Sequence, residues 1–191
     1  MYLYLKRSLD ISCAIVGLAI MAIPFAAIAV AIKMDSKGPI IFRQQRMGKD
    51  LKPFTCYKFR SMCTEAPHDC KAEELTHRDA YVTRVGSFLR ATSLDETPQL
   101  INILKGDMSL IGPRPVVLTE QNLIRQRAKM GVYKLRPGLS GLAQISGRNF
   151  VTDEEKVAYD YEYLCKASLG FDLKLIGKTI LYVVNGTGVM A

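Results

Sequence analysis

Cysteine is scarce in this sequence, and its spacing is irregular. Five cysteines occur among 191 residues, an odd number without a C-x2-C pair. No A-x-A cleavage site follows the first apolar run, so a secretory signal peptide is not expected. A secreted disulfide framework is therefore excluded, and a reducing compartment is expected. The loose group Cys63, His68, Cys70 and His77 lacks the usual spacing of zinc ligands, so we expect no zinc site there.

Nucleotide-binding signatures and tryptophan are also missing. The chain contains neither G-x-x-x-x-G-K-[ST] nor G-x-G-x-x-G, so P-loop and Rossmann nucleotide binding have no support. The absence of tryptophan and of a recognisable nucleic-acid-binding motif argues against a nucleic acid partner.

Apolar residues and positive charge are abundant. The length fits one domain, and the 49% hydrophobic content excludes a wholly disordered chain. Lys and Arg number 26 against 18 Asp and Glu, a net charge of +8. This balance predicts an anionic partner, for which nucleic acid, an anionic membrane surface and phosphorylated substrates are the candidates.

The longest apolar run lies near the N-terminus. Residues 11–32 contain no charge, and as a helix these 22 residues would extend roughly 33 Å, enough to cross the hydrocarbon core of a bilayer. A helix that is apolar on every face is unusual inside a small domain, so a membrane segment is favoured over a buried core helix.

The topology of this run stays open from the residues alone. Pro24 removes an intrahelical hydrogen bond near the middle, and both flanks are basic. Lys6 and Arg7 precede the run, and residues 33–60 carry eight Lys or Arg against two Asp. Positive charge favours the cytoplasmic side at both ends, as in a re-entrant helix-break-helix, but a Pro-kinked spanning helix is equally compatible.

The rest of the chain predicts a mostly helical α+β domain with one small β-hairpin. Residues 39–44 and 53–59 are apolar and aromatic on either side of a turn-like segment, 46–50, which is typical of a hairpin. Apolar residues at helical spacing then predict a helix that ends near Arg90.

A capping-box pattern follows at Ser93 and Glu96. It predicts an α-helix with Ser93 as the N-cap and with Asp95 and Glu96 in the first turn. The positive end of the helix dipole would keep these carboxylates ionised and would favour phosphate nearby, although acids in a first turn are also ordinary capping chemistry.

Two segments rich in Pro and Gly contain arginines that suit phosphate. Arg114 lies between two prolines in residues 112–115, and a rigidly held Arg can form several charge-assisted bonds to phosphate. Arg136 and Arg148 bracket the second segment. A second capping box begins at Thr152, and residues 171–184 could lie in a membrane interface or form an ordinary core helix.

Taken in order, these motifs resemble the bacterial sugar transferases, and in particular the small monotopic phosphoglycosyl transferases that start polyprenol-linked glycan assembly. The resemblance covers essentially the whole chain. It rests on the apolar run with its proline and on six motifs with compact spacing: YKFRSM (57–62), SLDE (93–96), KGDMS (105–109), GPRP (112–115), RPG (136–138) and GRN (147–149).

The resemblance implies a Mg2+-dependent enzyme that transfers a sugar 1-phosphate from a UDP-sugar to undecaprenyl phosphate and releases UMP. It implies that Asp95 is the nucleophile of a covalent phosphosugar intermediate and the metal contact, and that Glu96 completes a catalytic dyad. Candidate substrate-binding residues are Lys58, Arg60, Arg90, Arg114, Arg136, Arg148 and Asp172.

The resemblance also implies an architecture and a location. Residues 1–36 would form a re-entrant membrane helix broken at Pro24, where Ile23 replaces the serine typical of the family. Residues 37–191 would form a catalytic domain with interfacial amphipathic helices on the cytoplasmic face of the inner membrane, in contact with phospholipid. Whether this domain is a monomer or a homodimer stays open. Two alternatives stay open: a basic, non-catalytic membrane adaptor, and a soluble enzyme with a cleaved leader.

Overall fold

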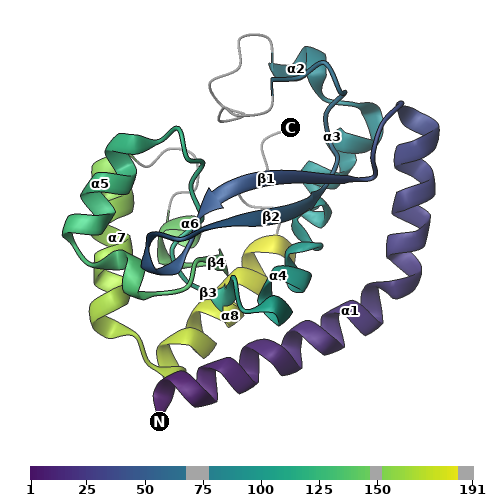
Figure 1. Cartoon of the computed structure of the whole chain (residues 1–191). Helices are drawn as coiled ribbons and strands as arrows, with labels where there is room; N and C mark the ends of the chain where they lie inside the picture. The colour runs from purple at the N-terminus through teal and green to yellow at the C-terminus, as the bar shows by residue number, and fades with distance from the viewer. Residues whose placement is uncertain (68–77, 147–151, 185–191) are drawn as a thin grey trace.

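The computed structural model describes residues 1–67, 78–146 and 152–184 and is mostly helical, as predicted (Figure 1). Its α-helices are α1 (Tyr2–Asp35), α2 (Arg78–Tyr81), α3 (Arg84–Ala91), α4 (Gln99–Lys105), α5 (Gln121–Lys129), α6 (Leu142–Ser146), α7 (Asp153–Lys166) and α8 (Leu169–Val184). Its strands are β1 (Ile41–Met47), β2 (Pro53–Phe59), β3 (Ser109–Ile111) and β4 (Gly138–Ser140). Single 3-10 turns are η1 (Lys49–Leu51), η3 (Leu94–Glu96) and η4 (Val132–Lys134).

The N-terminal helix α1 is long and bent. The chain stays helical on both sides of Pro24, so the predicted break at this residue is not confirmed. Figure 1 shows two arms that follow different sides of the molecule and join at a bend. Because Pro24 has no N–H, it cannot complete the helical hydrogen bond to the preceding turn, and such a gap is a common cause of bending.

One side of α1 packs on the rest of the chain. Ala14 and Leu18 join an apolar cluster with Ile103 of α4, whereas Ile32 joins another with Phe59 of β2. Most of the other side chains of α1 are exposed. The length and composition of α1 are those of a helix that could cross a membrane. Core helices of soluble proteins and signal sequences can have the same length and composition. The helix therefore closes two parts of the core and also presents a long apolar surface.

Strands β1 and β2 form the predicted hairpin. They pair antiparallel in a register that sets Phe42 opposite Lys58, Gln44 opposite Cys56 and Arg46 opposite Phe54. The second strand has its predicted bounds, but the first is shifted toward the turn, which is the 3-10 turn η1. The hairpin crosses the middle of the molecule, with α1 and α3 at one end and α5 and α7 beyond the other (Figure 1).

The capping box predicted at Ser93 is wrong, whereas the one at Thr152 is confirmed. Ser93 has a positive φ of 57° and its side chain caps no backbone N–H, so it turns the chain after α3 rather than beginning an α-helix. The acids that follow lie in η3, and α4 begins only at Gln99. Thr152 and Glu155 form both bonds of a capping box at the start of α7.

A parallel pairing of β3 and β4 was not predicted from the sequence. It joins the GPRP and RPG motifs, because Gly112 directly follows β3 and Gly138 begins β4. A Cβ atom on either glycine would overlap the backbone of the other strand. These glycines therefore serve the close approach of two backbones rather than a phosphate-binding loop.

Candidate active site

A cleft of about 670 Å³ opens between the hairpin, the segment that follows it, α3 and η3. Four of the predicted site residues line it: Lys58, Arg60, Arg90 and Asp95. The remaining lining residues are Pro39, Ile40, Ile41, Phe42, Arg43, Gln44, Arg46, Phe59, Ser61, Met62, Cys63, Thr64, Ala66 and Pro67. The cleft thus combines basic side chains and a carboxylate with an apolar wall.

Asp95 lies at the cleft with 9% of its surface exposed. Its carboxylate accepts no hydrogen bond from the part of the chain that the structure describes, although Lys58 and Arg90 are close enough to favour its charge. Burial raises the pKa of Asp95 above its ordinary value, with a further rise from the charge of Glu96. Asp95 lies in the 3-10 turn η3, so the α-helix N-terminus that was expected to keep its carboxylate ionised is not there.

Glu96 is held by two cations. Lys58 donates from Nζ to Oε1 at 2.7 Å, and Arg114 donates from Nη2 to the same oxygen at 2.8 Å. Burial alone would raise the pKa of Glu96, but the charges of Arg114 and Lys58 and their hydrogen bonds outweigh that effect and hold the pKa well below its usual range. Glu96 is thus a fixed anion whose oxygens are engaged by protein donors.

The two adjacent carboxylates have different surroundings and can therefore do different things. Glu96 aligns Lys58 and Arg114 beside the cleft, and Asp95 offers the oxygen atoms that remain available to a ligand. Among the described residues no group of three or more His, Cys, Asp or Glu could form a metal centre from protein ligands alone. A site with one carboxylate fits Mg2+, which commonly takes one or two carboxylates and completes its shell with water and substrate phosphates. Asp95 is the residue that fits this requirement.

Arg60 lines the cleft, but its guanidinium is largely engaged by the end of α1. It donates to the carbonyl oxygens of Ser36 and Lys37 and to Ser36 Oγ. Gly38 follows with a φ of 123°, and a Cβ there would overlap the Arg60 guanidinium. Arg60 therefore fastens the C-terminus of α1 to the cleft wall, a role that the sequence did not indicate.

Arg90 also lines the cleft, and its Nε donates to Ser61 Oγ at 2.9 Å. Helix α3 brings it there because Gly86 packs directly on the carbonyl group of Ser61. Arg114 reaches the site from the turn after β3, through its contact with Glu96. Lys58, Arg90 and Arg114 thus lie near the two carboxylates, and their binding of substrate phosphate stays a prediction.

Two other predicted residues lie elsewhere, and one is outside the described residues. Arg136 donates from Nε to the carbonyl oxygen of Gly106 at 2.9 Å and thereby joins β4 to the end of α4. Asp172 is buried in α8, where it accepts bonds from Tyr2, Lys6 and Tyr163. These contacts connect α8 to the start of α1 and do not bring Asp172 to the cleft. Arg148, like His68, Cys70 and His77 of the zinc group, falls outside the described residues.

Strand β1 supplies polar cleft residues that the sequence analysis did not select, namely Arg43, Gln44 and Arg46. Gln44 Oε1 accepts bonds from Nε and Nη2 of Arg46 at 3.0 and 2.6 Å. The alternation of a strand could have revealed two of them, because Gln44 and Arg46 share a face with Lys58 of the paired strand.

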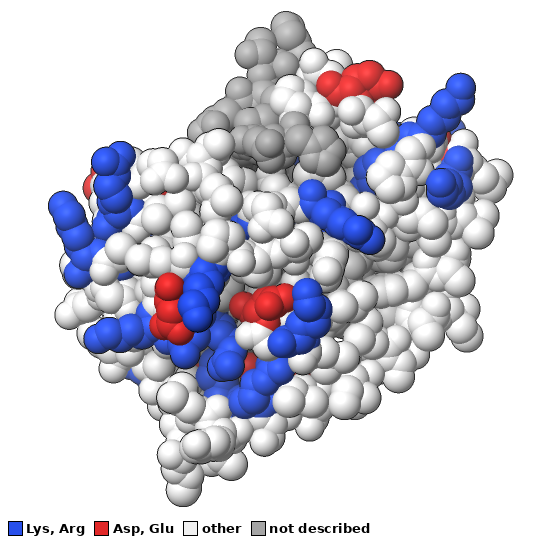
Figure 2. All heavy atoms as spheres, in the orientation of Figure 1, with Lys and Arg blue, Asp and Glu red and all other residues white. Residues whose placement is uncertain are grey.

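The surface separates charged and apolar regions. In the face shown by Figure 2, charged side chains lie over the left, the centre and the upper right, while the lower right margin, where Figure 1 places the bend of α1, is uncharged. The exposed apolar side chains of α1 include Ile15, Val16, Ile20 and Ile23. Phe88 of α3 and Ile101 of α4, both on helices that contact α1, are exposed as well.

A basic cleft with an asymmetric carboxylate pair lies in a domain that also carries a long, exposed apolar helix. A family model places the chain more specifically. Residues 1–186 match the bacterial sugar transferase model, so the chain belongs to that family.

Curated relatives agree with this membership. The chain is 43% identical over 183 residues to a UDP-glucose:undecaprenyl-phosphate glucose-1-phosphate transferase of Escherichia coli K12, an alignment that covers 92% of this chain and 39% of the relative. It is 38% identical over 193 residues to a UDP-N-acetylgalactosamine-undecaprenyl-phosphate N-acetylgalactosaminephosphotransferase of Aeromonas hydrophila, with 98% and 45% coverage. The chain thus spans less than half the length of these two relatives. An exopolysaccharide production protein, ExoY of Rhizobium meliloti, is 39% identical and is covered over 87% of its length.

Proposed function

We propose that this protein is a membrane-bound phosphoglycosyl transferase that moves a sugar 1-phosphate from a UDP-sugar to undecaprenyl phosphate, releases UMP and so initiates the assembly of a membrane glycoconjugate. The observation that carries this proposal is the carboxylate pair at the cleft, in which Asp95 faces the ligand space and Glu96 holds Lys58 and Arg114. The substrates named for the relatives, a UDP-sugar and undecaprenyl phosphate, support it.

The proposed reaction has two displacements at one phosphorus atom. A carboxylate oxygen of Asp95 attacks the sugar-bearing phosphorus of the UDP-sugar, the bond from that phosphorus to the UMP oxygen breaks, and UMP leaves. A phosphate oxygen of undecaprenyl phosphate then attacks the same phosphorus. The bond to Asp95 breaks, which restores the carboxylate and yields undecaprenyl-diphospho-sugar.

The basic residues at the cleft can stabilise the negative charge of the phosphate groups during both displacements. Phosphoryl transfer depends mainly on positioning and on the stabilisation of negative charge. Lys58 and Arg114 are pre-aligned by Glu96, and Arg90 lines the cleft from α3. Asp95 is the residue that would hold Mg2+, which would supply neutralisation of the diphosphate charge.

The packing of α1 supports a re-entrant topology. Tyr2 and Lys6 contact Asp172, and Ser36 and Lys37 contact Arg60, so both ends of α1 are attached to one domain. A folded domain lies on one side of a bilayer, and both ends of α1 therefore lie on that side. We propose that the bend of α1 enters the cytoplasmic leaflet of the inner membrane and that exposed apolar residues of α3, α4 and α8 lie in the interface with phospholipid.

The test of this function is the release of UMP by the purified full chain. A panel of UDP-sugars with undecaprenyl phosphate and Mg2+ in detergent should yield UMP with at least one sugar, and Asp95→Asn should abolish it. A radiolabelled sugar phosphate should remain on the wild-type protein, and not on Asp95→Asn, when undecaprenyl phosphate is omitted. Full activity of Asp95→Asn would contradict the covalent route, and no UMP with any sugar would contradict the proposed function.

A further inference from the structure

The turn that presents Arg114 is fixed through its backbone. Four consecutive carbonyl oxygens, those of residues 113–116, each accept a hydrogen bond from a different donor. The donors are Gly138 N to Pro113 O at 2.9 Å, Arg127 Nη1 to Arg114 O at 2.8 Å, Arg46 Nη1 to Pro115 O at 2.8 Å and Met47 N to Val116 O at 2.9 Å. Because β4, α5 and β1 supply these donors, the turn is held by three separate parts of the fold.

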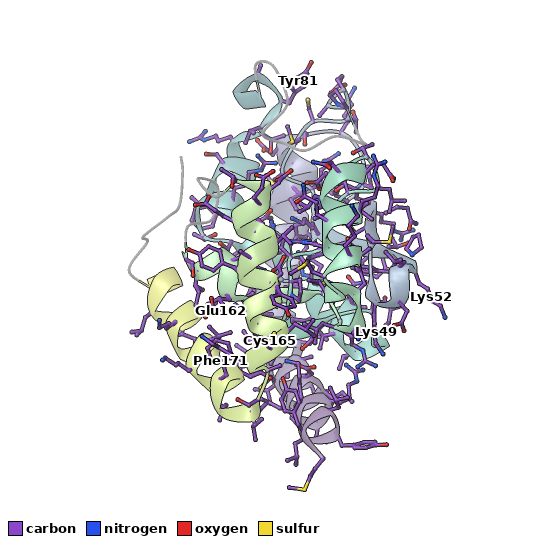
Figure 3. The ribbon with its side chains drawn as sticks, turned by 90° about the vertical axis from the view of Figure 1, so that its left-hand side faces the viewer. Lys49, Lys52, Tyr81, Glu162, Cys165 and Phe171 are labelled. Carbon is purple, nitrogen blue, oxygen red and sulfur yellow. The ribbon has the colours of Figure 1, made fainter. Side chains whose placement is uncertain are left out.

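Arg127 is the buried side-chain donor among them. It lies in α5 with 2% of its side chain exposed, and its Nη2 is 2.5 Å from Oδ2 of Asp160, which is 2% exposed in α7. Helices α5 and α7 lie side by side, as Figure 3 shows from the left-hand side of the molecule. The planar guanidinium therefore contacts a carboxylate with one amino group and the carbonyl oxygen of Arg114 with the other.

Burying this ion pair costs free energy of hydration, and packing alone does not explain why a buried pair is present here. A buried Arg–Asp pair loses the hydration of both charges, and apolar replacements of similar volume are often equally stable. Neither Arg127 nor Asp160 lines the cleft, so neither contacts a ligand there. What the pair provides is a fixed donor to the backbone of Arg114.

We infer that Arg127, oriented by Asp160, is a positioning residue for Arg114 in the proposed phosphoryl transfer. Arg114 is exposed over 46% of its side chain, and a long, exposed side chain has many rotamers to lose when it is held in one position. The fixed backbone limits where the guanidinium can lie, and Arg46 supports the same turn from the side of the cleft. This inference rests on the proposed function for its kinetic consequence, but its structural consequence can be measured independently.

The kinetic test compares variants on α5. Arg127→Gln should lower kcat for UMP release roughly 10- to 100-fold, since small displacements of a positioned group have effects of this size. Arg125→Gln is the matched control, because Arg125 is exposed on the same helix and, within the described residues, donates to the carbonyl oxygen of Gln121. Arg127→Lys retains a cation beside Asp160 but not the two-pronged contact, so it should fold as the wild type does and recover only part of kcat.

A double-mutant cycle separates positioning from general damage. If Arg127 acts through Arg114, adding Arg127→Gln to Arg114→Gln should lower kcat by less than about twofold, because the group being positioned is already absent. An undiminished further loss would contradict the inference, as would wild-type kcat in a folded Arg127→Gln protein.

Hydrogen–deuterium exchange provides the readout that does not depend on turnover. In detergent-solubilised full chain, Arg127→Gln and Arg127→Lys should accelerate exchange in peptides that cover residues 110–118 and leave those of α3 unchanged. Unchanged exchange in the turn of both variants would overturn the inference even if the wild type is active. If the wild type releases no UMP, the proposed function fails and the exchange result alone decides whether Arg127 fixes the turn.

Discussion

At the scale of single residues, two neighbouring carboxylates in the candidate site have different roles. Asp95 and Glu96 are adjacent in sequence, but burial raises the pKa of Asp95 while Arg114 and Lys58 hold that of Glu96 low. The motifs predicted that both carboxylates matter. Their opposite pKa shifts could not be predicted, because they depend on the burial of Asp95 and on Lys58 and Arg114, which are 38 and 18 residues from Glu96 along the chain.

The pH dependence of activity should report this difference. Asp95 must be ionised to attack phosphorus, so kcat/KM for the UDP-sugar should fall on acidification, and the fall should begin at a higher pH than for an ordinary aspartate. Lys58→Gln removes a positive charge that favours ionisation, so it should move the acid limb upward by about one pH unit. Lys52→Gln, at the end of the hairpin visible in Figure 3, should leave the limb in place. An unchanged limb in Lys58→Gln would show that another group controls it.

At the scale of elements, local patterns were informative and pairings between distant segments were not. Two apolar, aromatic-rich segments on either side of a turn-like one predicted the hairpin, and Thr152 with Glu155 predicted the start of α7. Ser93 carried the same capping signature but adopts a left-handed conformation, since the chain must turn sharply between α3 and η3. The parallel β3–β4 contact involves three-residue strands, which are too short to leave a periodic signal.

The position of α3 depends on one glycine. A Cβ atom at Gly86 would overlap the carbonyl group of Ser61, whose hydroxyl holds Arg90. Gly86→Ala should therefore displace α3, destabilise the fold by about 1–3 kcal/mol and lower activity through Arg90. Thermal unfolding and UMP release measure the two effects.

Gly177 provides the matched control for this prediction. It lies in α8, and a Cβ there would meet no atom within 4 Å. Gly177→Ala should keep or slightly raise stability, because alanine is the better helix former. If Gly86→Ala were as stable and active as Gly177→Ala, the close packing of α3 on Ser61 would not matter.

At the scale of the whole molecule, α1 is both an apolar surface and a part of the domain. The sequence predicted the apolar run from its lack of charge, but it gave no sign of the contacts that fix both ends. Tyr2 and Lys6 bind Asp172, Arg60 binds the last turn, and Asp10 accepts bonds from Ser109 Oγ and the Leu110 N–H. These partners are distant in sequence, so no local pattern records them.

The attachment of both ends predicts where they lie relative to a membrane. In a cysteine-free variant, single cysteines at residues 2, 37 and 52 should all react with an impermeant thiol reagent from the cytoplasmic side of inverted membrane vesicles. Residue 52 is the control, because it marks the side of the hairpin and thus of the catalytic domain. Labelling of residue 2 from the side opposite to residue 37 would refute re-entry and establish a spanning helix.

The bond between Tyr2 and Asp172 joins residues 170 positions apart, which has a consequence during synthesis. At a translation rate of about 5–20 residues per second, Tyr2 and Lys6 wait roughly 10–30 s before their acceptor leaves the ribosome. For that interval the start of α1 has no native partner on α8, while its apolar stretch is already available to the bilayer. In the proposed topology, α1 therefore reaches the membrane before its contact with α8 forms.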